Sequence, residues 1–218
     1  MSTEPGLRER KKERTRAALI EAAADLFGRK GYDETTVAEI AAAADVSTRT
    51  FFSYFRTKEE VLFVDNAERL RIAQAAVRQR LPGERPVDVL TRTAQQVLTT
   101  DTFASELFVR LAPLRVRLIL GNPALQGYAL RLLLSGQTEL ARGLHETFAD
   151  ELDEVIAAAM VGAFIGAMVA VVMQLFAEVP DPEQAILVDQ DHLVAELRRG
   201  MAVAVAGLAA VGDQPAPR

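Results

Sequence analysis

The sequence predicts an all-α protein in which a long helix joins an N-terminal three-helix domain to a larger helical domain. Apolar residues recur at helical spacing along nearly all of the 218 residues, and no stretch shows the sustained alternation of a half-buried strand. Several expected helices begin with Ser, Thr, Asn or Asp caps, and the clearest mid-chain loop is the Pro- and Gly-containing segment 82–86. We expect domains at residues 1–58 and 59–212, and a disordered tail at 213–218.

Composition limits the chemistry that this chain can perform. Half of its residues are hydrophobic and a quarter are charged, which is typical of a folded protein. There is no cysteine, and with only two histidines, His145 and His192, neither a zinc site nor histidine-based catalysis is expected. We therefore predict that the chain is not an enzyme and uses no metal or cofactor. Because residues 1–16 are polar and basic, with no apolar core of an export signal, a cytoplasmic location is expected.

The first helix is expected over residues 7–29, with Leu19 and Leu26 on its apolar face. The second begins at Thr36, which forms a Ser/Thr-x-x-Glu capping box with Glu39. In such a box the hydroxyl and the carboxylate satisfy backbone amides that the helix itself leaves without partners. Together these signals predict two helices joined by a short loop.

A tight turn at Asp45 is expected to follow the second helix, because Asp tolerates the left-handed conformation that such turns often need. Ser47 caps a third helix over residues 48–55, whose Phe51 and Phe55 share one face. Three short helices with a tight turn between the second and third form a helix-turn-helix.

A long helix over residues 57–81 is expected to act as the lever between the two domains. Asn122-Pro123 marks the start of a later helix, since Pro is favoured at the first helical position. The further expected helices span residues 87–99, 103–120, 124–147, 152–178 and 182–211.

The N-terminal pattern closely resembles the DNA-binding domain of the TetR (tetracycline-repressor) family, over about residues 12–62 and without gaps. The matching residues are Thr15-Arg16, Ala22-Ala23, Leu26-Phe27, Gly31-Tyr32, Thr35-Thr36-Val37, Ile40-Ala41, Ala44-Asp45-Val46-Ser47, Thr50-Phe51-Phe52, Tyr54-Phe55 and Thr57-Lys58-Glu59. Asp45 stands where the family most often has Gly, and Phe52-Ser53 stands where Tyr-Tyr is frequent. The resemblance implies a homodimeric, ligand-responsive bacterial transcription regulator, a repressor released from a pseudo-palindromic DNA operator by a small-molecule effector.

Candidate DNA contacts follow from the residues and from this resemblance. The exposed face of the third helix offers short polar and basic side chains, among which Arg49 suits guanine and Phe52 a thymine methyl. Tyr54 and Lys58 match family positions that grip backbone phosphate, and Thr36 could offer its hydroxyl to another phosphate. The full set is Arg14, Thr36, Ser47, Thr48, Arg49, Phe52, Ser53, Tyr54 and Lys58.

A plainer role stays open for several of these residues. Thr36 and Ser47 could serve only as helix caps, and Lys58 could simply be solvated. The chain carries a net charge of −5, yet residues 8–16 hold six basic and two acidic residues. Such a run suits phosphate binding, but it is also common at a solvated helix start.

Residues 155–177 contain one polar side chain, Gln174, and are long enough to cross a membrane. Two interpretations compete: a buried dimer helix, or a helical membrane-associated protein with an N-terminal partner-binding module. The flanks of this stretch are acidic and no Trp marks a membrane interface, so we favour the dimer and expect no membrane partner. In TetR-like proteins the last two long helices pair with those of a second subunit. The small residues expected at this interface are Ala158, Gly162, Gly166 and Ala170.

The resemblance also implies that the larger domain binds ligand in a cavity between its helices. The segment Asn122-Pro123-Ala124-Leu125 and the N-terminal pattern resemble a group related to the mycofactocin regulator, which implies acyl-coenzyme A (acyl-CoA) as effector; another apolar ligand remains an alternative. Ordinary core packing is the competing interpretation for the apolar candidates. The candidate effector-binding residues are Phe103, Phe108, Arg110, Tyr128, Gln137, Phe164, Met168 and Gln174.

Overall fold

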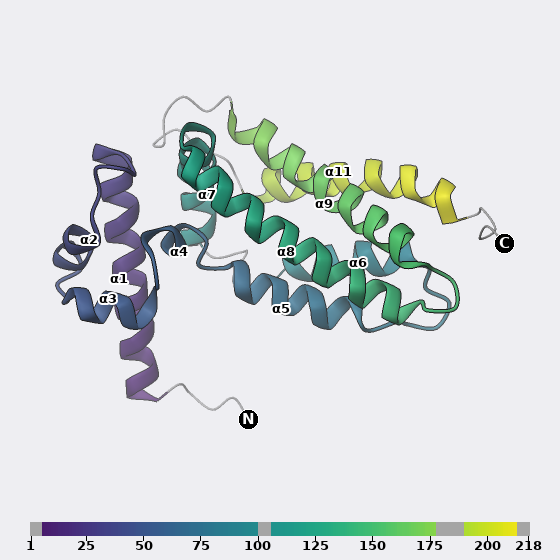
Figure 1. The fold of residues 1–218 in the computed structure, drawn as a ribbon, viewed down its shortest axis with the longest axis horizontal. Coiled ribbons are helices and arrows are strands. Elements are labelled where there is room, and N and C mark those ends of the chain that lie inside the picture. The colour runs from purple at the N-terminus through teal and green to yellow at the C-terminus, as the bar shows by residue number, and fades with distance from the viewer. Residues whose placement is uncertain (1–5, 100–105, 178–189, 213–218) are drawn as a thin grey trace. The chain divides into compact units, whose positions relative to one another are not determined.

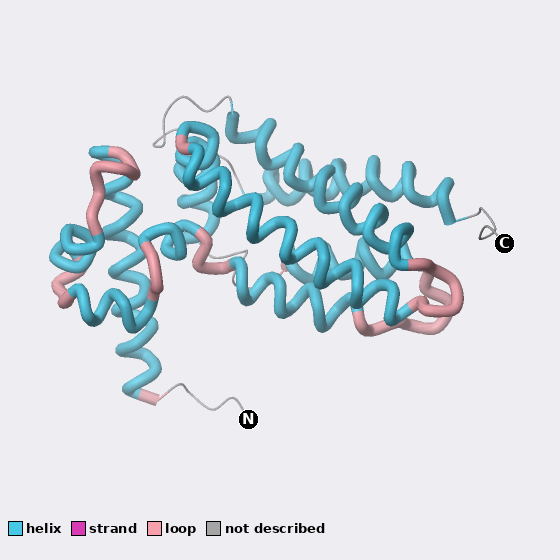
Figure 2. Tube along the Cα trace, in the orientation of Figure 1, coloured by secondary structure: helices cyan, strands magenta, loops and turns pink. Residues whose placement is uncertain are grey.

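The computed structural model describes residues 6–99, 106–177 and 190–212, and all regular structure within them is helical (Figures 1 and 2). The all-α prediction is therefore confirmed. The chain divides into two compact units, Met1–Val64 and Asp65–Arg218. The predicted disordered tail at 213–218 lies outside the described residues.

The N-terminal unit contains four helices that pack around a small apolar core. Leu19, Phe27, Ile40 and Phe51 are almost completely buried at its centre, and Phe55 closes one side. The second helix packs against the first and the third, and the fourth packs against the first. The helices are α1 (Leu7–Lys30), α2 (Val37–Ala43), α3 (Thr48–Tyr54) and α4 (Lys58–Leu62).

The turn between α2 and α3 forms as the sequence predicts. Asp45 has φ 54°, the left-handed conformation, which a short polar side chain tolerates better than other non-glycine residues. Two backbone bonds close the turn, from Asp45 N–H to Ala42 O (3.1 Å) and from Val46 N–H to Ala41 O (2.9 Å). Asp thus fills the position where the resembling family most often has Gly.

The prediction of one long helix over residues 57–81 is wrong. The segment forms two helices, α4 and α5 (Asn66–Val77), which are separated by residues 63–65. Leu62 at the end of α4 is buried in the N-terminal unit, and the unit boundary falls at this break, at Val64/Asp65 rather than at 58/59. Arg16 fixes the end of the unit by donating to Val64 O (3.0 Å). The core of the N-terminal unit therefore interrupts a segment that contains no Pro or Gly to mark the break.

The C-terminal unit is a helical bundle. Helix α8 packs against α5 and α9, and α11 packs against α9 (Figure 1). Asn122 caps α8 as predicted, accepting hydrogen bonds from Ala124 N–H (2.9 Å) and Leu125 N–H (3.1 Å). Besides α5, the helices are α6 (Pro86–Leu98), α7 (Glu106–Gly121), α8 (Pro123–Thr147), α9 (Glu154–Ala177) and α11 (Gln190–Gly212).

Helix α9 has one covered and one open face. Its inward residues, such as Val161 and Phe164, are buried, whereas Val155 is 75 % exposed. By length and composition, Glu154–Leu175 could cross a membrane: its mean hydropathy is 2.6, and 22 % of the segment is buried within the protein. The open face of α9 is therefore apolar and needs a covering surface. A second subunit would cover it in the dimer interpretation, and lipid would cover it in the membrane interpretation.

Gly143 sits where α8 packs on α5, and we predict that a methyl group there is harmful. A Cβ at Gly143 would lie 2.9 Å from Val77 Cγ1, and Val77 is fully buried. Overpacking costs about 1–3 kcal/mol and outweighs the helix preference of Ala over Gly, about 1 kcal/mol. Gly143→Ala should therefore lower the free energy of unfolding by up to about 2 kcal/mol in urea titrations.

Gly127 provides the matched control on the same helix. A Cβ there would lie 3.7 Å from Arg131 Nη1, an ordinary contact, so Gly127→Ala should leave stability unchanged or raise it by up to about 1 kcal/mol. If Gly143→Ala proves as stable as wild type, the packing of α8 on α5 is looser than described.

Candidate functional site

The open face of α3 carries the side chains predicted to read DNA. Thr48, Arg49 and Ser53 are exposed, and Phe52 is 56 % exposed, whereas Phe51 on the opposite face is fully buried. The N-terminal unit therefore presents one short helix with a polar, basic and aromatic face that its own core does not use.

Three hydroxyl groups near this face hydrogen-bond within the protein. Ser47 Oγ accepts from Thr50 N–H (3.0 Å), and Ser53 Oγ donates to Thr50 O (2.6 Å). Thr36 Oγ1 accepts from Glu39 N–H (3.3 Å) and donates to Glu39 Oε2 (2.7 Å), while Glu39 Oε2 accepts from Thr36 N–H (2.8 Å). The capping box and the Ser47 cap are confirmed, so these hydroxyls hold the helix starts whether or not they also meet DNA.

Lys58 is turned inward, not left to solvent. Its Nζ donates to Tyr32 O (2.8 Å) and Thr35 O (3.1 Å) and lies 4.0 Å from the centre of the Tyr32 ring. Tyr32 in turn donates its hydroxyl proton to Glu59. Burial and this bond to the Glu59 carboxylate raise the pKa of Tyr32, so it stays a protonated donor at neutral pH.

These contacts fasten α4 to the loop that precedes α2. Sequence reasoning did not assign Tyr32 and Glu59 a role, although both belong to the matched pattern. Their function is to position the helices that carry the exposed side chains. Tyr54, the other predicted phosphate contact, is half-buried at the end of α3.

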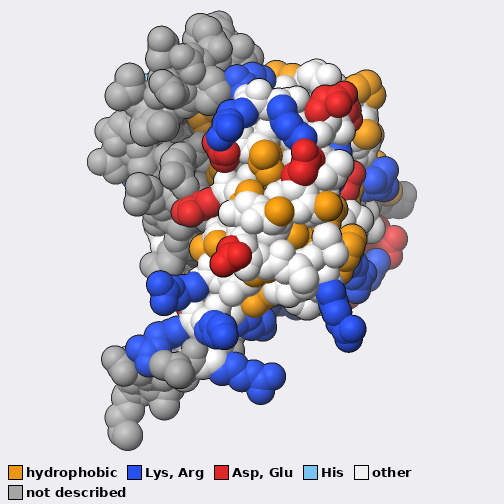
Figure 3. Space-filling model, turned by 90° about the vertical axis from the view of Figure 1, so that its left-hand side faces the viewer, with side chains coloured by type: hydrophobic (Ala, Val, Ile, Leu, Met, Phe, Trp, Pro, Cys, Tyr) orange, Lys and Arg blue, Asp and Glu red, His pale blue; other side chains and the backbone are white. Residues whose placement is uncertain are grey.

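Basic residues are concentrated on the N-terminal half of α1. Arg14 is exposed there, whereas Arg16 points inward, with its guanidinium carbon 6.0 Å from the centre of the Phe55 ring. In Figure 3, Lys and Arg side chains lie along the lower edge of the face shown and again near its top, with acidic side chains between them. The exposed basic residues on this half of α1 are Arg8, Arg10, Lys11, Lys12 and Arg14.

The C-terminal unit contains an open pocket of about 380 Å³ between α5, α6, α8 and α9, with one residue from α11. Of the predicted effector-binding residues, Gln137, Phe164 and Met168 line this pocket. The walls are mainly Leu, Val, Ile, Met and Ala side chains, as expected for a small-molecule site.

The other predicted effector-binding residues are not brought to the pocket. Tyr128 lies beside Arg131, whose guanidinium carbon is 5.5 Å from the ring centre, and Gln174 is exposed on α9; neither lines the pocket. The structure therefore does not bring these two residues to this pocket. Phe103 lies outside the described residues, as do the side chains of Phe108 and Arg110.

Sequence reasoning missed three polar residues that do line the pocket: Asn66, Arg69 and Thr93. Asn66 and Arg69 share one face of α5, at a spacing of three residues. Helical periodicity could have placed them together, but only the packing of α5 shows which face is inward.

A second buried arginine, Arg115, neighbours Arg69, which lines this pocket. The Arg115 side chain is largely buried, and its Nη2 lies 3.7 Å from Asp65 Oδ2. Burial, together with the neighbouring Arg69 guanidinium, lowers the pKa of Arg115 to about 10, and Asp65 opposes the shift. Burial likewise lowers the pKa of Arg69. Both guanidiniums remain charged at neutral pH and could attract an anionic part of a ligand.

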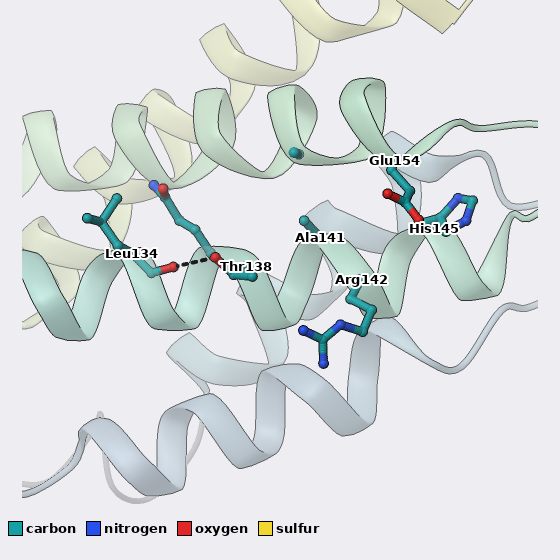
Figure 4. A pocket seen from close by; sticks show the side chains of 8 residues that line it. Leu134, Thr138, Ala141, Arg142, His145 and Glu154 are labelled. Atoms are coloured by element: carbon teal, nitrogen blue, oxygen red, sulfur yellow. Dashed lines mark hydrogen bonds between the residues drawn. The ribbon is translucent and has the colours of Figure 1, made fainter.

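A shallow groove of about 390 Å³ runs between α8 and the start of α9 (Figure 4). His145 and Glu154 lie next to each other at one end, and His145 Nδ1 is 2.7 Å from Leu152 O. Because that oxygen is a carbonyl, Nδ1 carries the proton and donates. Within the described part of the chain, no cluster of His, Asp and Glu residues could hold a metal ion.

The two units and the open face of α3 define a helix-turn-helix protein with a helical domain that contains a pocket. Residues 19–63 match the family described as bacterial regulatory proteins, tetR family. The N-terminal domain of the chain thus matches the DNA-binding domain of TetR family transcriptional regulators. This agrees with the prediction that it is not an enzyme.

Two curated relatives support the assignment. The regulator TcmR of Streptomyces glaucescens is 43% identical over 94 residues, covering 43% of this chain and 42% of TcmR. The regulator HbdR of Aromatoleum sp. (strain CIB) is 42% identical over 52 residues, covering 24% of this chain and 23% of HbdR. The chain thus matches less than half the length of either relative.

Solved structures extend the likeness to the whole fold. Thermus thermophilus FadR, a TetR family repressor solved with lauroyl-CoA, has a TM-score of 0.53 and 25% identity, covering 93% of this chain and 99% of FadR. A regulator from Aquifex aeolicus VF5 has a TM-score of 0.50 at 18% identity, covering 87% and 98% of the two chains, and supports the fold alone. The predicted TetR fold is confirmed.

The capping box at α2 should make the stability of the protein depend on pH. The hydrogen bond from Lys30 Nζ (2.5 Å) and the bonds from Thr36 lower the pKa of Glu39 to about 2, against 4.5 for a free side chain. The Glu39 carboxylate therefore takes up a proton less readily in the folded state than in the unfolded state. The stabilisation is present above pH 4.5 and is lost as pH falls from there toward 2.

We therefore expect Glu39→Gln to be less stable than wild type at pH 7, and the difference to shrink between pH 4.5 and pH 2. Urea titrations of both proteins across this range measure it. Glu13 is a suitable control, because it is exposed on α1, so Glu13→Gln should be neutral at pH 7. A Glu39→Gln difference that stays constant across the range would contradict the charged cap.

Proposed function

We propose that this protein is a homodimeric, ligand-responsive DNA-binding repressor that acts in the cytoplasm. The observation that carries the proposal is the open face of α3, on which Thr48, Arg49 and Phe52 are exposed while Phe51 anchors the helix from behind. In a dimer, two such helices would enter successive major grooves about 34 Å apart on a pseudo-palindromic operator.

Each candidate residue has a distinct role in this proposal. Arg49 reads guanine through two parallel hydrogen bonds, and Phe52 packs on a thymine methyl. Arg14 and its basic neighbours on α1 bind phosphates, which adds affinity without sequence preference. The Lys58 ammonium has three N–H donors and uses two of them to bond protein carbonyls, so its main role is to position the helices. The third donor can bond a phosphate.

Arg49→Ala tests DNA reading. The preferred site of the wild type is first selected from a random DNA pool, and affinities for all single-base variants of that site are then measured. We expect Arg49→Ala to relax the preference at one position of each half-site and to cost about 1–3 kcal/mol in binding.

The control is Arg29→Ala, because Arg29 is equally exposed in the same unit and pairs with Asp25 (3.0 Å) at the far end of α1. It should bind all site variants as wild type does. Retention of the full base preference by Arg49→Ala would remove Arg49 from base recognition.

We infer that a second copy of the chain covers the open face of α9. Ala158, Gly166 and Ala170 are exposed on it and Gly162 is half-buried; a Cβ at either glycine would meet nothing within 4 Å in the single chain. Val203 on α11 is 73 % exposed as well. A two-fold pairing of these small-residue faces would bury apolar surface that one subunit leaves in water.

Gly166→Leu separates a dimer from a monomer by the sign of its effect. In a monomer the added side chain meets open space, and the helix gains from losing a glycine. In the dimer it forces bulk into a close helix crossing on both subunits, at about 1–3 kcal/mol per site. We expect Gly166→Leu to lower the dimer fraction in light scattering, or to aggregate, and to bind operator more weakly.

Gly28→Leu is the control, since a Cβ at Gly28 on α1 also meets nothing within 4 Å and lies outside the inferred interface. It should leave the oligomeric state unchanged. A wild type that is monomeric, or a Gly166→Leu protein that dimerises normally, would overturn the interface. Recovery of wild type only with membranes would instead favour the helical membrane-associated protein.

We propose acyl-CoA as the effector. The pocket has apolar walls suited to an acyl chain, and Arg69 lines it. The segment Asn122-Pro123-Ala124-Leu125 resembles the group related to the mycofactocin regulator, and FadR, with a similar fold, was solved with lauroyl-CoA. To release DNA, the ligand must bind more tightly to the conformation that fits the operator poorly.

A further inference from the structure

A buried hydroxyl in the wall of the pocket has no partner. Thr93 on α6 is 6% exposed, and within the described part of the chain its Oγ1 makes no hydrogen bond. A threonine in a helix can donate to the carbonyl three or four residues earlier. Thr91 on the same helix does so, donating to Val87 O (2.8 Å). The Thr93 hydroxyl does not, and Thr93 lines the pocket.

Three further polar side chains line this pocket from other helices. Asn66 and Arg69 come from α5 and Gln137 from α8. A Cβ at Gly136 would touch Leu70 Cδ1 (3.6 Å), so the adjacent residues Arg69 and Gln137 lie at a similar height along the bundle. Polar side chains from three helices therefore line one pocket whose other walls are mainly apolar.

An unpaired hydroxyl in such a cavity disfavours the empty state and favours a ligand that brings a hydrogen-bond acceptor to it. The ligand must be mostly apolar to match the walls, and must carry an oxygen inside its apolar body. An acyl thioester fits this description, because its carbonyl oxygen is an acceptor between the acyl chain and the polar carrier.

We propose that Thr93 donates a hydrogen bond to the thioester carbonyl oxygen of an acyl-CoA, with the acyl chain held among the apolar walls. This inference rests on the proposed acyl-CoA effector. Arg69 lies on the same pocket, and its guanidinium, with five N–H donors, can serve the protein and the polar part of the ligand together. The pocket thereby distinguishes an acylated carrier from an alkyl chain of the same length.

Two probes that differ at one position test this contact in the full-length protein. Lauroyl-CoA carries the thioester carbonyl, and S-dodecyl-CoA is the thioether with a methylene in its place. Binding of each is measured by calorimetry to wild type and to Thr93→Val, which removes the hydroxyl with little change of shape. We expect wild type to prefer the thioester about tenfold, and Thr93→Val to lose this preference.

Three controls separate a ligand contact from a structural role. Thr93→Ser should retain the preference, and so should Thr91→Val, because the Thr91 hydroxyl is already bonded to Val87 O. The ligand-free Thr93→Val protein should melt at a higher temperature than wild type, since it loses an unpaired buried hydroxyl. A hydroxyl that supports the fold would instead give a lower melting temperature.

The outcomes distinguish this inference from the proposal beneath it. If wild type binds both probes equally, or Thr93→Val keeps the thioester preference, the Thr93 contact is overturned and the acyl-CoA effector stands. If neither probe binds wild type, the acyl-CoA effector is rejected, and this inference with it.

Discussion

The candidate DNA-binding face depends on the burial of Phe51. Helix α3 has seven residues, too few to be stable on its own in water. Its conformation is fixed by Phe51, which is completely buried, and by Phe55, which is buried at the end of the helix. Because side chains three and four residues apart share a helix face, burying Phe51 turns Arg49, Phe52 and Ser53 outward. One apolar contact thus sets the orientation of the side chains proposed to read bases.

The same unit divides its basic residues between internal and external partners. Arg16 and Lys58 bond to backbone carbonyls and lie against aromatic rings, and so tie α1 and α4 to the rest of the unit. Arg14 and Arg49 are exposed instead. A count of charges along the sequence cannot separate these roles, since only the fold determines which cations face carbonyls. The division leaves the outward cations free to meet phosphate and base edges.

Local sequence signals predicted the N-terminal unit well, because helix caps and a tight turn determine where its helices begin and end. The Thr36 capping box, the left-handed Asp45 and the shared face of Phe51 and Phe55 each depend on residues close in sequence. The break after Leu62 could not be predicted in this way, since it arises from the core that Leu62 joins.

The residues that line the pocket were also hard to predict from local sequence. Gln137 was identified as a polar residue in an apolar setting, but Thr93 and Arg69 were not, because helix spacing alone cannot show which faces of separate helices meet. Gln174 was chosen by the same reasoning as Gln137, yet it lies on the exposed face of α9. Both glutamines stand among apolar residues in the sequence. Only tertiary packing shows that Gln137 lines the pocket and that Gln174 is exposed.

Helix α9 links the pocket to the inferred dimer face. Phe164, Ile165 and Met168 line the pocket, while Gly166 and Ala170 of the same helix are exposed on its other side. A helix moves largely as a rigid body, so a ligand that displaces the inner side chains also displaces the outer surface. In the proposed dimer, two such helices meet across a two-fold axis, and small residues allow a close crossing whose geometry is sensitive to shifts of either helix. Ligand binding and the spacing of the two DNA-reading helices would thus be coupled through one element, provided that the ligand binds the two arrangements with different affinity.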